Sequence, residues 1–258
     1  MQFRRIKVLM LILFFLLDIF LLNWWRSGQV PSAQVTDANM DIITEMKKQK
    51  IELPKFSTSV KYSRYIAAQR GDRHTMYLPA GIDIVNGTSI NTVIARFKTS
   101  DILKDGTNTG SKINNPTAIA YSAGYHYNPI LTADKRNSDR VYSQRIEGLP
   151  VISDNGIINF RYNSDKIPTG FTQTQLVNVE KLREARATIT EEDAIIALYR
   201  YNEIGDGDEL SKGYLSYDRS LTVNGYDIYL PVWAFEAYSG KEKYVLKINA
   251  FTGDNLSE

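Results

Sequence analysis

The chain has 258 residues, of which 43% are hydrophobic, and a formal net charge of +2. Four cations and one acid lie in the first 26 residues, so the remainder has 27 cations and 28 acids, a net charge of −1. This balance excludes the basic footprint that is typical of nucleic-acid-binding proteins. The sequence contains no cysteine, which excludes disulfide bonds and a lipid-modified cysteine.

The N-terminal segment predicts a single-pass membrane anchor. Residues 1–7 form a basic leader, residues 8–25 an apolar helix that ends in Trp24 and Trp25, and residues 26–36 a polar stalk. At about 1.5 Å per residue, 18 residues reach roughly 27 Å, enough to cross a thin hydrocarbon core. Because cations precede the span, the N-terminus is expected inside the cell and the rest outside. A cleavable signal peptide is the alternative, but bulky side chains follow the apolar run where small ones are needed.

One acid, Asp18, lies near the middle of this apolar segment, between Leu17 and Ile19. A carboxyl group at the centre of a membrane span costs about 2.5 kcal/mol or more unless it is paired or neutral. Intramembrane ionisable residues usually face a partner helix, so Asp18 is predicted to contact another transmembrane helix. The alternative is that a single-pass helix tolerates one protonated or snorkelling carboxyl group.

The residues after the stalk predict an α+β ectodomain of two units, each a helix plus an antiparallel sheet. The first unit, residues 37–131, is expected to hold a helix that Thr36 or Asp37 caps and that runs to about Lys50. Its strands are expected at residues 62–69, 76–78, 82–85 and 90–97. Asn86-Gly87 favours a hairpin turn, and residues 104–117 are expected to form a long exposed loop.

The second unit, residues 132–258, is expected to begin with strands at residues 141–146, 151–153 and 157–162. Thr174 can cap a helix that runs to about Ala187, and Thr190 begins a capping box that opens another helix. The last strands are predicted at residues 213–217, 226–238 and 243–250, with turns at Asn224-Gly225 and Ser239-Gly240 between them. Pro231 interrupts the second of these and predicts an edge or a bulge there.

The residues that could carry catalysis or bind a metal do not form a recognisable set. His74 and His126, the only histidines, lie 52 residues apart, and no Gly-x-Ser-x-Gly motif occurs. Residues 105–110 and 206–209 loosely resemble calcium loops but lack the full alternation of oxygen ligands. We therefore predict no catalytic residue, no metal site and no cofactor, and hence a protein that is not an enzyme.

An aromatic-rich strand, Tyr229-Leu-Pro-Val-Trp233-Ala-Phe235, contains the only tryptophan outside the membrane segment. Two interpretations are open for Tyr229, Trp233 and Phe235. They pack in the core or between domains, or they form a docking anchor for another protein, since Trp and Tyr are enriched in binding hot spots.

Three segments resemble the YycI family, accessory proteins of the WalK/WalR (YycG/YycF) cell-wall two-component system of Gram-positive bacteria. The first is the basic leader and apolar span that ends in Asp18-Ile-Phe-Leu-Leu22. The second is Gln144-Arg-Ile-Glu-Gly-Leu-Pro-Val151 with Asn155-Gly-Ile-Ile-Asn-Phe160. The third is Tyr229-Leu-Pro-Val-Trp233 with Ile248-Asn-Ala-Phe-Thr-Gly-Asp254. The resemblance spans the whole chain, and the C-terminal helix and strands also resemble YycH-like and PepSY-like domains.

The resemblance implies a regulator without turnover, located in the cell membrane with its C-terminal domain outside. Its implied partners are a WalK-like sensor histidine kinase and a sister YycH-like protein, with much of the contact made by transmembrane helices. Two alternatives remain. A PepSY-type inhibitor of an extracellular protease or wall hydrolase would act through the ectodomain alone, and a membrane-anchored wall enzyme would need a facing pair of carboxylates.

Overall fold

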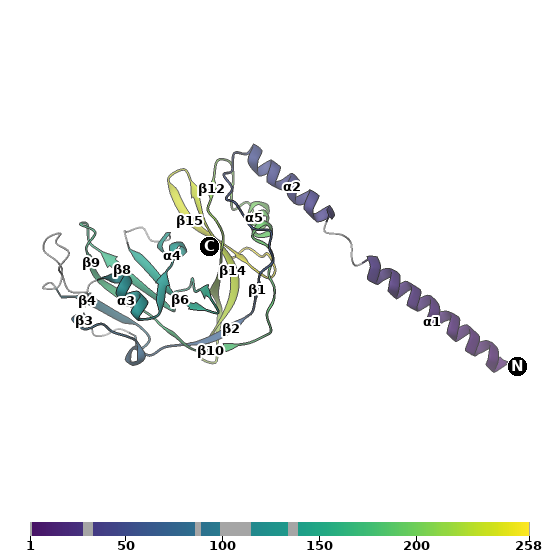
Figure 1. Ribbon diagram of the computed structural model, residues 1–258, viewed down its shortest axis with the longest axis horizontal. Helices are drawn as coiled ribbons and strands as arrows, with labels where there is room; N and C mark the ends of the chain where they lie inside the picture. Colours follow the sequence, from purple (N-terminus) through teal and green to yellow (C-terminus); the bar gives the residue numbers. More distant parts are fainter. Residues whose placement is uncertain (1, 28–32, 86–88, 99–114, 134–138, 258) are drawn as a thin grey trace. The chain divides into compact units, whose positions relative to one another are not determined.

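The computed structural model describes residues 2–27, 33–85, 89–98, 115–133 and 139–257 (Figure 1). The chain divides into two compact units, Met1–Thr44 and Glu45–Glu258. The first unit contains helix α1 (Gln2–Ser27) and most of helix α2 (Ala33–Lys48). The second unit has a mixed α+β fold with antiparallel sheets and few helices.

The larger sheet has seven strands in the order β3–β4–β9–β8–β6–β5, with β7 paired to β6. All of these neighbours are antiparallel. The strands are β3 (Ile82–Ile84), β4 (Val93–Phe97), β5 (Tyr125–Tyr127), β6 (Arg140–Ile146), β7 (Leu149–Pro150), β8 (Ile157–Tyr162) and β9 (Pro168–Gln173). Helix α3 (Pro116–Ser122) packs on this sheet through Ile119 and Ala120, which join a core of aromatic and aliphatic side chains.

The six-stranded sheet is built around β14 (Tyr226–Ser239), which pairs with β2, β12, β13 and β15. The other strands are β2 (Ile66–Arg70), β10 (Leu176–Lys181), β12 (Glu209–Leu210), β13 (Tyr214–Val223) and β15 (Glu242–Asn249). The short strands β1 (Tyr62–Ser63) and β11 (Arg186–Ala187) form a separate pair. The positive φ angles of Asn224 (50°) and Gly225 (81°) give the two-residue turn that joins β13 to β14.

A hydrophobic cluster lies between the two sheets and joins them. Helix α4 (Pro129–Ala133) contacts β6 of one sheet and both β14 and β15 of the other (Figure 1). Ile130 of α4 packs in a cluster with Ile152 and with Leu230, Val232 and Ala234 of β14. This cluster joins the two sheets, in addition to the core that the larger sheet has of its own.

The expected boundary near residue 132 does not coincide with a break in strand pairing. It lies between β5 and β6, which are neighbours in one sheet. Strands β3 to β9 form the larger sheet, whereas β2 from early in the chain pairs with β14 from near its end. The larger sheet is therefore an insertion in the sequence of the six-stranded sheet: its residues, 82–173, lie between β2 and the later strands of the six-stranded sheet.

The prediction of a helix at residues 174–187 is wrong, since this segment forms the strands β10 and β11. β10 is antiparallel to β2, and the Gln144 side chain accepts from the Leu176 N–H (2.7 Å) and donates to the Leu176 carbonyl (3.2 Å). The expected helical face would have included Leu182, which is 45% exposed. Long-range backbone pairing therefore outweighs local helix propensity here.

Pro231 lies inside β14. The bulge that was expected at this proline is found in the partner strand, β13. The register between β13 and β14 shifts between Arg219 and Leu221, close to the position where Pro231 pairs with Tyr217. On its other side β14 pairs with β2 up to Tyr229 and with β15 from Val232 onward. Pro231 therefore falls where the partner strand changes, so its missing N–H breaks no ladder on that side.

Other expected elements differ in detail. Residues 76–78 form no strand, although Met76 is buried in the core of the larger sheet; a short 3-10 helix, Arg73–Thr75, precedes it. Asn86-Gly87 and residues 104–114 lie outside the described residues. The expected loop ends earlier than predicted, because Asn115 caps α3 by accepting from the N–H groups of Thr117 and Ala118.

The predicted capping box at Thr190 is confirmed at the start of helix α5 (Glu191–Arg200). The Thr190 hydroxyl accepts from the Asp193 N–H (3.0 Å), and the Asp193 carboxylate accepts from the Thr190 N–H (3.3 Å). We expect Thr190→Ala to lower the free energy of unfolding by about 1 kcal/mol, because it leaves a helix N–H without its partner. Urea unfolding followed by circular dichroism measures this change, and Thr190→Ser should lose much less.

Candidate interaction site and cavity

The candidate chemical residues named from the sequence lie apart from one another. His74 is in the 3-10 helix, and His126 is on β5, where its ring meets Tyr121 edge-on at 5.2 Å. In the 206–209 loop, Asp208 accepts from the Gly205 N–H at 2.8 Å, and residues 105–110 lie outside the described residues. In the part of the chain that the structure describes, no three His, Cys, Asp or Glu side chains are grouped to hold a metal.

The aromatic residues of β14 are fully buried. Tyr229, Trp233 and Phe235 each have 0% of their surface exposed. The Trp233 indole N–H donates to the Ile189 carbonyl (3.0 Å), and its ring stacks on Phe235 with centroids 6.5 Å apart. Burial raises the pKa of the Tyr229 hydroxyl to about 12. This environment supports the packing interpretation, because a docking anchor needs side-chain surface that a partner can reach.

The segment that follows α2, residues 49–61, is fixed to the rest of the second unit by backbone hydrogen bonds. We call it the entry strap. Its Glu52 N–H donates to the Asp208 carbonyl (2.8 Å), and its Glu52 carbonyl accepts from the Leu210 N–H (2.9 Å). At its far end, the Lys61 carbonyl accepts from the Thr188 N–H (2.8 Å), and the Lys61 ammonium lies 4.6 Å from the centroid of the Trp233 ring.

The buried carboxylate of Glu191 holds the middle of the entry strap. Glu191 is 2% exposed and accepts from the N–H of Ser57 (3.0 Å) and the N–H of Gly213 (2.8 Å). Gly213 is required at this point, since a Cβ there would lie 2.6 Å from Cε1 of Phe235. This role has no signature in the sequence, because an acid in the first turn of a helix is already explained by the helix dipole. Its burial is what distinguishes it from its neighbour Glu192.

A second polar cluster joins the two sheets at Asp227, which is 1% exposed. Arg70 binds its carboxylate in a bidentate manner, with nitrogen–oxygen distances of 2.8 and 3.0 Å. Thr222 from β13 and Asn155 from the turn after β7 also donate to it. Burial alone would raise the pKa of the Asp227 carboxyl group. The hydrogen bonds from Arg70 and Thr222 and the positive charge of Arg70 have the larger opposite effect, so the pKa is lower than its ordinary value. Asp227 was not among the residues singled out from the sequence; an acid within an otherwise apolar strand is the signal that could have identified it.

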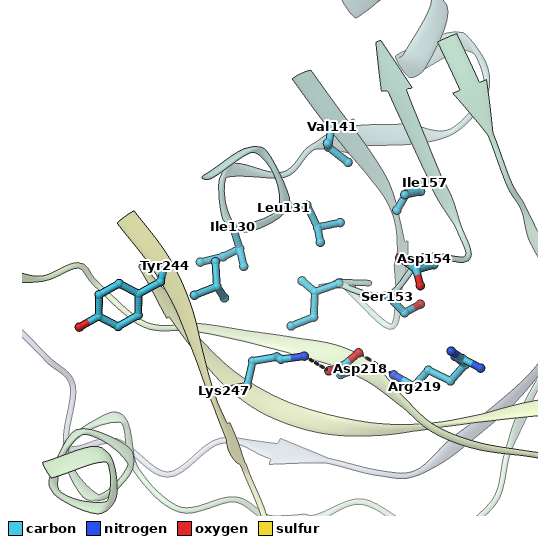
Figure 2. Close-up of a pocket in the computed structure, with 12 residues that line it drawn as sticks. Ile130, Leu131, Val141, Ser153, Asp154, Ile157, Asp218, Arg219, Tyr244 and Lys247 are labelled. Carbon is cyan, nitrogen blue, oxygen red and sulfur yellow. Dashed lines mark hydrogen bonds and ion pairs between the residues drawn. The ribbon is translucent and has the colours of Figure 1, made fainter. Parts of the chain in front are cut away.

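A cavity of about 480 Å³ lies between the two sheets. Figure 2 shows its apolar wall, formed by α4, β6 and the segment around Ile157, opposite a polar wall formed by β13 and β15. On the polar wall, Lys247 forms an ion pair with Asp218 (2.9 Å), and Asp218 also accepts from the N–H of Arg219 (2.8 Å). Ser153, Asp154 and Tyr244 complete the polar lining.

Asp18 lies on α1 in the first unit. Its neighbours Leu17 and Ile19 are 50% and 51% exposed, and the apolar side chains of α1 that are described, from Val8 to Leu22, are all at least half exposed. Among the helices of the described residues, none is both long enough and apolar enough to cross a membrane. The single-pass topology therefore stays a prediction from the sequence.

The family comparison agrees with the resemblance seen in the sequence. Residues 31–251 match the model of the family described as YycI protein. The chain belongs to the YycI family. The YycI family is a membrane-associated accessory family, and membership indicates a regulatory role in the WalK/WalR system.

Solved structures similar to this YycI-family chain have low sequence identity. An uncharacterized protein from Eubacterium rectale is 12% identical, with a TM-score of 0.45 over 81% of this chain and 89% of its own. The YpeB C-terminal domain of Bacillus megaterium is 11% identical, with a TM-score of 0.37 over 85% of this chain and 94% of its own. A comparison with curated proteins found no match.

Proposed function

We propose that this chain is a non-enzymatic regulator, anchored by α1 in the cell membrane, that associates with a WalK-like sensor histidine kinase and a YycH-like accessory protein. The observation that carries the proposal is that the described apolar side chains of α1, from Val8 to Leu22, are exposed and that a single acid, Asp18, lies among them. An apolar surface of this kind is suited to lipid, and an acid within it is suited to a partner helix.

The proposed topology places the N-terminus in the cytoplasm and the second unit outside. The 26 residues of α1 span about 39 Å at 1.5 Å per residue, compared with a hydrocarbon core of about 30 Å. Its cations Arg4, Arg5 and Lys7 precede the apolar residues, which favours the inside orientation of the leader. Residues 1–7 and 8–25 are then leader and span. The expected stalk, residues 26–36, is shorter than predicted, because α2 begins at Ala33, before the expected caps Thr36 and Asp37.

An accessory protein changes kinase activity only if it binds one kinase state more tightly than another. The entry strap supports such a role, because its hydrogen bonds to Asp208, Leu210 and Glu191 fix the point where the chain enters the second unit. The chain therefore enters the second unit at a fixed point, beside the surfaces that a bound partner would contact.

We expect Asp18→Leu to reduce co-purification of the kinase or of the YycH-like protein by about 3- to 30-fold. The reason is that one polar contact between transmembrane helices contributes about 0.6–2 kcal/mol. The measurement is photocrosslinking from position 18 in native membranes, with mass spectrometry of the captured proteins, followed by quantitative co-purification of the variant. The second unit should keep its unfolding temperature, because Asp18 lies outside it.

Asp18→Asn is the matched control, since it keeps hydrogen-bonding groups and should retain most of the association. Capture of lipid alone, together with normal co-purification and signalling in Asp18→Leu, would refute the partner contact. A soluble fragment of residues 33–258 separates the alternative inhibitor from the proposed regulator: full activity of this fragment would favour the inhibitor.

A further inference from the structure

The cavity between the sheets carries two opposite charges that have no ion-pair partner among the described residues. Of the four charged side chains that line it, Lys247 and Asp218 neutralise each other at 2.9 Å. Arg219 and Asp154 remain, and neither side chain forms a salt bridge with a described residue. The cavity therefore offers one guanidinium and one carboxylate to a ligand.

The positions of these two residues are fixed by hydrogen bonds of the backbone around them. The Asp154 carbonyl accepts from the Thr174 hydroxyl (3.0 Å), and the next residue, Asn155, donates to the buried Asp227. The N–H of Arg219 donates to Asp218, which the Lys247 ion pair holds in place. A site whose backbone is already ordered loses less entropy when a ligand binds.

The opposite wall of the cavity is apolar. It is lined by Ile130, Leu131, Val141, Ile152 and Ile157, and Val245 of β15 adds a further apolar side chain to the lining. Figure 2 shows the side chains of Leu131, Val141 and Ile157 extending from their wall toward the side of the cavity that holds Asp218 and Arg219. A volume of about 480 Å³ is within the range of about 300–1,000 Å³ that is typical of pockets for small molecules.

We propose that this cavity binds a zwitterion with an apolar side chain, namely a free apolar amino acid or a short apolar peptide. The ligand carboxylate binds the Arg219 guanidinium, the ligand ammonium binds Asp154, and the apolar side chain packs against Leu131 and Ile157. A plain acyl chain fits less well, because it would make no contact with the Asp154 carboxylate and would place apolar surface beside it; the Asp154 and Arg219 side chains are exposed and can be reached by a ligand. A purely anionic ligand would meet the repulsion of Asp154.

The test measures binding of L-leucyl-L-leucine to the full chain in lipid nanodiscs by saturation-transfer NMR and calorimetry. Three probes each remove one feature: the N-acetyl form lacks the ammonium, the C-terminal amide lacks the carboxylate, and glycyl-glycine lacks the apolar side chains. The two probes that lack a charge should bind about two- to fivefold more weakly, since an ion pair with an exposed side chain contributes up to about 1 kcal/mol. Glycyl-glycine should also bind more weakly, because it buries no apolar side chain in the cavity. Comparison with free L-leucine decides between an amino acid and a peptide as the preferred ligand.

Two variants test which charged group of the ligand binds Arg219 and which binds Asp154. Arg219→Gln should abolish the preference for the free carboxylate over the amide, and Asp154→Asn should abolish the preference for the free ammonium over the N-acetyl form. Arg183→Gln and Asp165→Asn are matched controls, since both side chains are exposed and neither lines the cavity. Absence of saturable binding of both leucine and leucyl-leucine, or preferences that stay unchanged in the two variants, would overturn the proposal.

Discussion

Replacing Trp233 with alanine is expected to lower the free energy of unfolding of the second unit by about 3–5 kcal/mol. The indole is fully buried, so the substitution leaves a cavity next to Phe235 and removes the hydrogen bond to the Ile189 carbonyl. It also removes the ring that the Lys61 ammonium of the entry strap faces at 4.6 Å. Urea unfolding of the full chain in mild detergent, followed by circular dichroism, measures the change.

Two further variants separate packing from other effects of the substitution. Trp233→Phe keeps an aromatic ring but loses the indole N–H, so we expect a smaller loss than for alanine. Tyr62→Ala removes an aromatic side chain that is 71% exposed and should change the stability by no more than about 0.5 kcal/mol. If Trp233→Ala were as mild as Tyr62→Ala, the side chain would be accessible in solution, and the docking interpretation would regain support.

The parts of the fold that the sequence predicted well are those determined by short-range interactions. The capping box at Thr190 needs only residues three apart, and the turn at Asn224 and Gly225 needs only two residues with positive φ. Both lie next to long apolar segments whose periodicity is clear. The expectation of antiparallel strands near residues 141–146, 157–162 and 226–238 succeeded for the same reason.

The parts that the sequence did not predict depend on residues far apart in the chain. β10 forms because β2, more than 100 residues earlier, offers an edge, and because Gln144 binds the backbone of Leu176. The role of Glu191 depends on Ser57 and Gly213, which only the folded chain brings together. The cavity is formed by α4, β6, β13 and β15, and no local pattern in the sequence indicates that these elements meet.

Removal of the Asp227 charge is expected to destabilise the second unit by about 2–4 kcal/mol at pH 7. Breaking a buried ion pair costs about 3–5 kcal/mol, and the lower range applies here because Arg70 is 41% exposed and stays partly hydrated. The variant is Asp227→Asn, which keeps the size of the side chain. The matched control is Asp83→Asn, since Asp83 is 68% exposed and pairs with Lys98 at 3.8 Å; it should change the stability by about 0.5 kcal/mol or less.

The same carboxylate predicts how stability depends on pH. The pKa of Asp227 is lowered in the folded state, so on acidification the unfolded chain takes up this proton first, near its ordinary pKa of about 3.9. The contribution of Asp227 is therefore fully present above that pH and is lost as the pH falls through the folded-state pKa. The stability gap between the natural chain and Asp227→Asn should be constant between pH 7 and 5 and should narrow below about pH 4. A gap that stays the same down to pH 2 would mean that the Asn variant fails for reasons of shape, and that the Arg70–Asp227 charge pair between β2 and β14 does not stabilise the second unit.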